Sequence, residues 1–197
     1  QKLLPEAIIN ASFFAKQVSR QRNYFDGKSG DRLLQVFAQL LNSATLELRV
    51  AQQEDLHLLF NWVNEPDVRH YSLNPAPIPF AQHKSWFGQK LADKNCFIFI
   101  AELNAQPVGM IRFDISQGEA VISFLLDKNY RGKGLGTLLL QKGIEKIRTA
   151  APKLTSISGL VQKRNIASVK AFTKAGFSAK DFGDSKHPNI FKFTMPA

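Results

Sequence analysis

The sequence predicts an α/β domain that follows a short helical extension. From Leu46 onward, stretches with the two-residue alternation of a strand take turns with stretches that have the 3.6-residue period of a helix. Three strand-like stretches follow one another directly, separated only by turn-like residues, which predicts an antiparallel meander. A glycine-rich stretch, residues 131–136, then joins a strand to a helix. This order of elements favours one domain over residues 46–197.

The first 41 residues form a separate segment in this interpretation. Apolar residues recur at helical spacing over residues 1–24 and again over residues 30–41. Residues 42–45, Asn-Ser-Ala-Thr, have the composition of a linker. We therefore expect a helical extension over residues 1–41, a linker over residues 42–45 and an α/β domain over residues 46–197.

Strands and helices within the domain are predicted from periodicity and from the residues that end each element. Pro66 ends the first helix, and three prolines between residues 70 and 79 predict a loop. A helix of about fifteen residues follows the glycine-rich stretch and ends near Pro152. The predicted strands are residues 46–50, 96–102, 108–115, 120–126, 157–161 and 190–195. The other predicted helices are residues 55–64, 80–92 and 166–174.

The composition is that of an ordinary globular protein. Hydrophobic residues make up 44% of the chain and charged residues 21%, which argues against disorder, collagen and a disulfide framework. Because Cys96 is alone, neither an internal disulfide nor a cysteine-rich zinc site can form. We therefore expect a core thiol in a cytoplasmic protein without a bound metal. The apolar runs are too short to span a bilayer.

The formal net charge is +10 and the isoelectric point is near 9.8. This charge favours polyanionic partners, which include nucleic acid, an anionic membrane surface and phosphorylated small molecules. The basic residues are scattered, however, and the sequence has neither zinc-finger spacing nor an aromatic RNA-binding signature. We therefore expect a small-molecule partner and neither nucleic acid nor a membrane.

The stretch Arg131-Gly132-Lys133-Gly134-Leu135-Gly136 is suited to an anionic ligand. Glycines let the backbone approach a ligand closely, and free amides at a helix N-terminus bind anionic oxygens. A pyrophosphate fits this chemistry, although a purely structural turn can have the same composition. The stretch matches neither a Walker loop, which needs Gly-Lys followed by Ser or Thr, nor the dinucleotide fingerprint, whose glycine spacing is longer.

Two motifs, in this order, resemble those of the GNAT superfamily of acetyl-coenzyme A-dependent N-acetyltransferases. Its pyrophosphate loop reads Gln or Arg, two residues of any type, Gly, one residue of any type, and Gly or Ala. Its second motif has an asparagine, a serine three residues on and a closing Gly-Phe. The residues that carry the resemblance are Arg131, Gly134, Gly136, Asn165, Ser168, Phe172, Lys174, Gly176 and Phe177. The resemblance implies the GNAT fold, a central mixed, mostly antiparallel sheet flanked by helices, with acetyl-coenzyme A as co-substrate.

The resemblance also implies where the coenzyme binds. The amides of residues 132–137 would hold the pyrophosphate, and the backbone edge of residues 124–126 would pair with the pantetheine arm while those side chains stay in the core. Asn165 would contact the arm or a bound water, and it is also suited to cap the following helix. The implied coenzyme-binding residues are Phe124, Leu125, Leu126, Arg131, Gly132, Lys133, Gly134, Leu135, Gly136, Thr137, Asn165 and Phe172.

Acetyl transfer needs a neutral amine, a group that takes its proton and a donor for the departing thiolate. Many members of the superfamily use a tyrosine as that donor, but Phe172 stands at the matching position and has no proton to give. Because a thiol has a pKa of about 8.5, the thiolate can leave unassisted or through water, and the loss should slow transfer rather than abolish it. The candidate catalytic bases are His83, Asp114 and Glu119, each of which could equally be structural.

Trp86 and Arg112 are the candidate acceptor-binding residues. They belong to residues 82–87 and 107–114, which together are similar to the acetyltransferases of pseudaminic acid biosynthesis. Those enzymes acetylate the 4-amino group of a UDP-linked amino-dideoxy sugar, so the resemblance implies an amino-sugar nucleotide as the acceptor. Arg112 and Asp114 alternate on one strand face, and a simple ion pair would explain that pattern equally well.

Residues 24–32, Tyr-Phe-Asp-Gly-Lys-Ser-Gly-Asp-Arg, resemble the C-terminal end of the nucleotide-sugar hydrolase of the same pathway, a family sometimes fused to such a transferase. The resemblance implies that residues 1–41 are the remnant of an upstream hydrolase domain, and an ordinary helical extension is the alternative. The apolar stripe of this segment must be covered by the transferase or by another copy of the chain, which leaves a homodimer open.

Two other functions stay open. Asn165, Ser168 and residues 174–177 also resemble the acetyltransferases that modify the N-termini of ribosomal proteins, and these can likewise lack the tyrosine. The phenylalanine at position 172 also leaves open a non-catalytic module that binds acyl-coenzyme A. The acceptor side, which would separate these functions, lies in loops that the sequence does not define.

Overall fold

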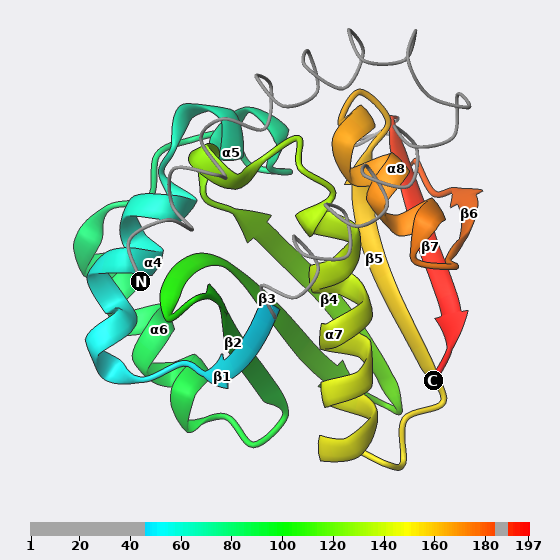
Figure 1. Cartoon of the computed structure of the whole chain (residues 1–197), viewed down its shortest axis with the longest axis horizontal. Helices are drawn as coiled ribbons and strands as arrows, with labels where there is room; N and C mark the ends of the chain where they lie inside the picture. Colours follow the sequence, from blue (N-terminus) through cyan, green and yellow to red (C-terminus); the bar gives the residue numbers. More distant parts are fainter. Residues whose placement is uncertain (1–45, 184–188) are drawn as a thin grey trace, which may run out of the picture. The chain divides into compact units, whose positions relative to one another are not determined.

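A single sheet with helices on both faces forms the described part of the molecule (Figure 1). The computed structural model describes residues 46–183 and 189–197. The predicted extension and linker, residues 1–41 and 42–45, lie outside the described residues, and these domain boundaries stay predictions. None of the helices in the described part is long and apolar enough to cross a membrane.

The sheet has seven strands in the order β1-β2-β3-β4-β5-β7-β6. Every neighbouring pair is antiparallel except β4 with β5, which is parallel. The predicted mixed, mostly antiparallel sheet is therefore confirmed. The strands are β1 (Leu46–Val50), β2 (Cys96–Leu103), β3 (Gln106–Ser116), β4 (Glu119–Leu126), β5 (Ser156–Gln162), β6 (Ser178–Asp181) and β7 (Ile190–Pro196).

Two tight turns build the predicted meander of β2, β3 and β4. The turns at Asn104-Ala105 and Gln117-Gly118 have positive φ at both central residues. This backbone twist matches that of the flanking strands, which is why two-residue hairpins favour it. The two turns set the register of the central hairpins, so that Leu103 pairs with Gln106 and Ser116 pairs with Glu119.

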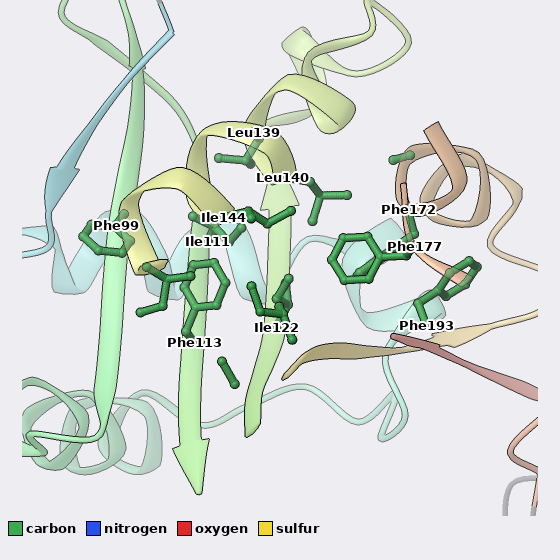
Figure 2. Close-up of a cluster of buried hydrophobic side chains, with 14 of the residues drawn as sticks. Phe99, Ile111, Phe113, Ile122, Leu139, Leu140, Ile144, Phe172, Phe177 and Phe193 are labelled. Atoms are coloured by element: carbon green, nitrogen blue, oxygen red, sulfur yellow. The ribbon is translucent and has the colours of Figure 1, made fainter. Parts of the chain in front are cut away.

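The helices divide between the two faces of the sheet. Leu139, Leu140 and Ile144 of α7 pack with Ile111 and Phe113 of β3 in the larger core, to which α8 also contributes (Figure 2). The helical elements are η1 (Gln53–Asp55), α4 (Leu56–Val63), α5 (Pro66–Tyr71), α6 (Phe80–Ala92), η2 (Lys128–Tyr130), α7 (Leu135–Ala150) and α8 (Ile166–Lys174).

A second, smaller core lies on the opposite face. Trp62 of α4 and Phe87 of α6 pack there with Ile100 and Met110, whose strand neighbours point into the larger core. Cys96 is half-buried at the edge of this cluster, and burial is the main cause that raises the pKa of its thiol to about 12. The lone cysteine therefore stays protonated and packs as a small apolar side chain.

The structure adds elements that the sequence did not predict. Pro66 does end α4, but it also begins α5, because proline at the first position of a helix has no amide that would need an acceptor. The predicted loop over residues 70–79 therefore begins only after Tyr71. Strand β6 was missed because all four of its residues are exposed, so no apolar alternation marks it.

The parallel strands β4 and β5 are paired over only part of their length. Residues 119–122 of β4 pair with residues 156–159 of β5. Beyond that point β4 pairs only with β3 and β5 only with β7, so residues 123–126 and 160–162 leave their facing backbone edges unpaired. Figure 1 shows the two strands diverging towards their carboxyl ends, and we call this region the β4–β5 opening.

The ring of Phe172 fills the base of this opening on the α8 side. It stacks on Phe193 with 4.9 Å between ring centroids (Figure 2). It meets Phe124 edge-on at 5.7 Å between ring centroids. Its ring tip faces Gly159, where a Cβ atom would lie only 2.5 Å from Cζ of Phe172. Gly159 is the last residue of β5 that pairs with β4. The absence of a side chain at Gly159 therefore makes room for the ring that lies where the strands part.

Gly159→Ala should destabilise the fold, because the added methyl group must displace the tip of the buried Phe172 ring. Overpacking of this kind costs about 1–3 kcal/mol, which urea unfolding measures. Gly88→Ala is the matched control, since Gly88 lies in α6 and has nothing within 4 Å of an added Cβ. If Phe172→Leu does not relieve the Gly159→Ala defect in a double-mutant cycle, the close contact does not cause it.

Candidate active site

The glycine loop between β4 and α7 adopts the conformation that its glycines predict. Gly132 has φ +75° and Gly134 has φ +80°, values that residues with a Cβ rarely adopt. The amides of Gly132, Lys133 and Gly134 have no acceptor among the described residues. The next amides, at the start of α7, have no intrahelical partner by geometry, except that Thr137 donates to the Gly134 carbonyl at 3.2 Å. A run of free amide donors therefore lies at and directly before the N-terminus of α7, as an anion site requires.

The second predicted coenzyme segment is the carboxyl end of β4. Phe124 and Leu126 pack against the larger core, and Leu125 packs against the smaller one on the opposite face. All three are half-buried, while their backbone edge towards β5 is unpaired. The side chains thus hold the strand in place while its backbone can pair with an amide-bearing chain.

Asn165 and Phe172 lie on α8, beside the carboxyl end of β5. The Asn165 side chain accepts a hydrogen bond of 3.1 Å from the Ser168 amide, so it caps α8. A role for Asn165 in coenzyme binding stays a prediction. Phe172 is 2% exposed and belongs to the aromatic cluster described above, so it has a structural role whether or not it meets the coenzyme.

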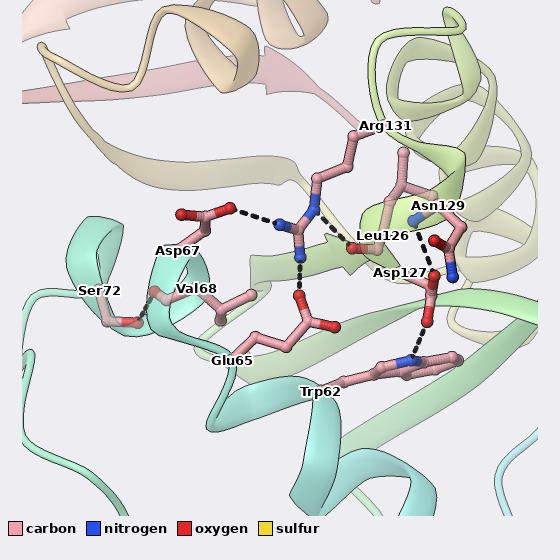
Figure 3. Close-up of polar contacts among 9 residues, drawn as sticks. All are labelled: Trp62, Glu65, Asp67, Val68, Ser72, Leu126, Asp127, Asn129 and Arg131. Atoms are coloured by element: carbon pink, nitrogen blue, oxygen red, sulfur yellow. Dashed lines mark hydrogen bonds and ion pairs between the residues drawn. The ribbon is translucent and has the colours of Figure 1, made fainter.

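Arg131, the first residue of the pyrophosphate motif, points away from the glycine loop towards α5 (Figure 3). Its Nε donates to the Leu126 carbonyl at 2.9 Å, which fixes the end of β4. Its two terminal nitrogens form ion pairs with Glu65 and with Asp67, the latter at 3.2 Å. Arg131 therefore connects the loop to α5, and a direct role in binding the coenzyme stays a prediction.

A second contact connects the segment before the glycine loop to α4. Trp62 of α4 donates from its indole Nε1 to a carboxylate oxygen of Asp127 at 3.0 Å (Figure 3). The other oxygen of Asp127 accepts from the Asn129 amide at 2.9 Å and caps η2. Lys133 is turned towards η2, where it donates to the Asn129 carbonyl at 2.8 Å. The glycine loop thus begins from a segment that α4 holds in place.

The predicted acceptor-binding residues lie on the other face of the sheet, beside α6. Arg112 lies over the ring of Trp86 at 4.9 Å from its centroid. The same guanidinium donates to Asp114 at 2.8 Å, and Lys90 donates to the other oxygen of Asp114 at 2.6 Å. Burial raises the pKa of Asp114, but its contacts with Lys90 and Arg112 outweigh this effect, so the pKa is lowered. Asp114 is therefore a carboxylate with both oxygens engaged.

Glu119 lies on the same face, at the paired end of β4. It accepts hydrogen bonds from the Ser158 hydroxyl and from Lys192, the latter at 2.8 Å. These bonds lower the pKa of Glu119. Since a strand rises about 3.3 Å per residue, Glu119 lies roughly 13 Å along β4 from Ser123, where the opening begins. The structure therefore does not bring Glu119 and the opening together, and a catalytic role for it stays a prediction.

His83 is in the core and not in an open site. It is 2% exposed and packs among the rings of Phe60, Trp86 and Phe87. Burial lowers the pKa of His83, and its Nε2 has no hydrogen-bond partner among the described residues. Of the three candidate bases, only His83 has a pKa that favours the neutral form of a base, but its ring is buried away from solvent. The described residues also hold no cluster of His, Cys, Asp or Glu side chains that could bind a metal ion.

Several residues of this region were missed from the sequence. Glu65, Trp62, Gln162 and Arg164 all connect the α4–α5 region to the carboxyl ends of β4 and β5. Their partners lie 65 to 94 residues away along the chain. Such contacts leave no local pattern, so periodicity and motif spacing could not find them.

Residues 45–178 match the acetyltransferase (GNAT) domain family. The match covers more than half of the chain, and the chain belongs to this family. The prediction of an N-acetyltransferase that uses acetyl-coenzyme A is thereby confirmed. The more specific resemblances, to enzymes of pseudaminic acid biosynthesis and to a hydrolase, stay predictions.

Relatives and solved structures agree with this assignment. An uncharacterized N-acetyltransferase of Bacillus subtilis, YfmK, is 24% identical over 136 residues, which span 68% of this chain and 85% of that protein. The aminoglycoside acetyltransferase AAC(6')-Ib, solved with paromomycin and acetyl-coenzyme A, has a TM-score of 0.67 at 23% identity, covering 77% of this chain and 93% of its own. Spermidine N-acetyltransferase from Vibrio cholerae, solved with coenzyme A and spermine, has a TM-score of 0.68 at 18% identity, covering 78% and 96%. At these identities the two structures establish the shared fold.

His83 should make the stability of the chain depend on pH. Its pKa is lowered in the folded state, so stability is fully present above the unfolded pKa of about 6.5 and is lost as pH falls below it, by up to about 1.4 kcal/mol per pH unit. Urea unfolding between pH 5 and 7.5 measures this slope. His83→Leu should remove it, whereas His57→Leu, at an exposed position, should not. An unchanged slope in His83→Leu would contradict the burial of a neutral imidazole.

Substitutions at the two motif glycines should differ in their effect on acetyl-coenzyme A binding. Gly134→Asp adds a side chain at φ +80° and a negative charge beside the free amides, so calorimetry should show affinity weakened by more than about tenfold. Gly136→Ala is the control, because its Cβ would lie at ordinary contact distances of 3.6 Å from Phe124 and 3.7 Å from Ala171. Its affinity should stay within about threefold. A folded Gly134→Asp chain with unchanged affinity would place the pyrophosphate elsewhere.

Proposed function

We propose that the chain transfers the acetyl group of acetyl-coenzyme A directly to a primary amine of a small molecule. The observation that carries this proposal is the β4–β5 opening with the glycine loop directly after β4. The unpaired edge of residues 123–126 can pair with the pantetheine arm, and the free amides that begin at Gly132 can hold the pyrophosphate. These two sites follow each other along the chain in the order that one extended coenzyme molecule requires.

In this mechanism the chain's own groups position the reactants and do little acid–base chemistry. The amine attacks the thioester carbonyl, and the coenzyme A thiolate leaves without a proton from residue 172. Both oxygens of Asp114 are engaged, and its lowered pKa makes it a weak base. We therefore propose that water at the opening takes the proton of the amine. Asp114 and Glu119 instead balance the charge of the cationic side chains with which they pair.

We infer that the acceptor is an amino sugar linked to UDP. The resemblance of residues 82–87 and 107–114 favours it. Lys90 and Arg112 share the single carboxylate of Asp114, which leaves one positive charge on this face of the sheet for a phosphate to pair with. The Arg112 guanidinium lies 4.9 Å from the centroid of the Trp86 ring, and a guanidinium beside an aromatic ring is suited to a planar uracil or a phosphate. A cytoplasmic location follows from such a substrate.

An acceptor panel tests this function. Release of free thiol from acetyl-coenzyme A should be fastest with a UDP-linked 4-amino-dideoxy sugar, compared with short peptides, an aminoglycoside and spermidine. Higher kcat/KM for peptides would favour the ribosomal-protein type of acetyltransferase. Coenzyme binding without turnover of any amine would favour the non-catalytic module.

We also propose that residues 1–41 are a remnant of a nucleotide-sugar hydrolase and take no part in the chemistry. The resemblance of residues 24–32 supports this. The same panel, run on a chain that begins at Ala44, should give an unchanged preference among the acceptors and a lower solubility. A folded, soluble chain that has lost turnover would contradict the proposal and place the segment in the active site.

A further inference from the structure

Helix α5 is a short helix whose position depends on polar contacts. It has six residues, none of them buried, so apolar packing contributes little to holding it. Arg69 connects the chain on either side of α5 by donating to the carbonyl of Val63, the last residue of α4, at 3.3 Å and to the Asn74 carbonyl after α5. The Ser72 hydroxyl adds a bond of 2.6 Å to the Val68 carbonyl. The segment is therefore a compact unit that other elements must hold in place.

One end of this unit is held from the β4 side. Arg131 follows β4 by five residues and already fixes the Leu126 carbonyl. Its guanidinium also pairs with Glu65, directly before α5, and with Asp67 in the first turn of α5 (Figure 3). The amino-terminal end of α5 is thus attached to the strand edge and loop that we assign to the coenzyme.

The other end is held from the β5 side. Gln162, the last residue of β5, donates from its amide to the Ser72 carbonyl at 2.7 Å. Arg164 donates to the His70 carbonyl at 2.7 Å. Arg164 also donates to the side-chain oxygen of Gln162 at 2.7 Å, which orients the amide of Gln162. Backbone carbonyls accept both hydrogen bonds, so the bonds hold the segment in position and do not depend on which side chains it carries.

We propose that residues 65–72 form a strap that bridges the carboxyl ends of β4 and β5 across the opening, and that Gln162 and Arg164 are positioning residues that set where the acceptor amine meets the thioester. Because β4 and β5 are parallel, their carboxyl ends lie at the same edge of the sheet, so a segment attached to both crosses the opening. This inference rests on the proposed function, since the opening is where that function places the thioester.

The two attachments have different consequences. The Arg131 attachment shares a residue with the coenzyme loop, so its loss would disturb coenzyme and acceptor together. The attachment through Gln162 and Arg164 comes from β5 and does not involve the free amides that begin at Gly132. Loss of the β5 attachment should therefore leave coenzyme affinity intact and weaken the use of the acceptor.

The test removes the β5 attachment with Gln162→Met and Arg164→Met, singly and together. Arg148→Met is the matched control, because Arg148 also donates from its guanidinium to a backbone carbonyl, that of Pro196 at 3.0 Å, but far from the strap. Hydrogen exchange of the Arg69 and Ser72 amides, which are bonded within the strap, should be faster in the double variant and unchanged in Arg148→Met. Unchanged exchange in the double variant would overturn the proposal.

Kinetics then separate positioning from a merely structural role. The Kd for acetyl-coenzyme A should stay within about twofold, while the KM for the acceptor rises by about tenfold or more. Arg164→Lys keeps a charged donor and should recover part of kcat/KM. An equal loss of coenzyme affinity, or faster exchange with an unchanged acceptor KM, would overturn the assignment. Exchange and coenzyme titration need no acceptor, so failure of every amine in the panel would count against the proposed function and not against the strap.

Discussion

The site depends on one feature of the sheet: the parallel strands β4 and β5 stop pairing before either strand ends. Parallel neighbours in a sheet normally continue their hydrogen bonds as long as both strands run, because an unpaired backbone edge is costly unless something satisfies it. Here Phe172 lies at the point where pairing ends, against Gly159, and Phe193 and Phe124 hold the ring in place. The unsatisfied edge beyond that point is available to a ligand with amides of its own.

The strap and its two attachments depend on this separation. Because the strands part, Arg131 after β4 and Gln162 at the end of β5 are spaced widely enough to hold opposite ends of the strap. Had the strands stayed paired, a six-residue helix would have had no separated attachment points. The early end of β4–β5 pairing thus leaves separate attachment points for polar contacts at this edge of the sheet.

The features of the site that depend on local sequence could be predicted. Those that depend on contacts between distant parts of the chain could not. The glycine loop and the Asn165 cap were predicted because the residue types encode backbone conformation directly, as the positive φ at Gly134 and the bond to Ser168 bear out. His83 could not be placed, because a histidine on a helix has the same sequence pattern in a core as in an open site. The carboxylate partners of Arg131 could not be predicted either, since Asp67 and Glu65 lie more than 60 residues away along the chain.

Phe172 connects the structural and the chemical aspects of the site. In the superfamily a tyrosine often stands at this position, and its hydroxyl would extend the ring from Cζ. In this chain the ring tip points at Gly159, where an added Cβ would lie 2.5 Å from Cζ, so a hydroxyl on Cζ would crowd the backbone of β5. The ring is also 2% exposed, so it lies in the core and away from solvent. The tight fit against Gly159 is therefore a physical reason for a phenylalanine here. We assign the proton that the departing thiolate takes up to the solvent side of the opening.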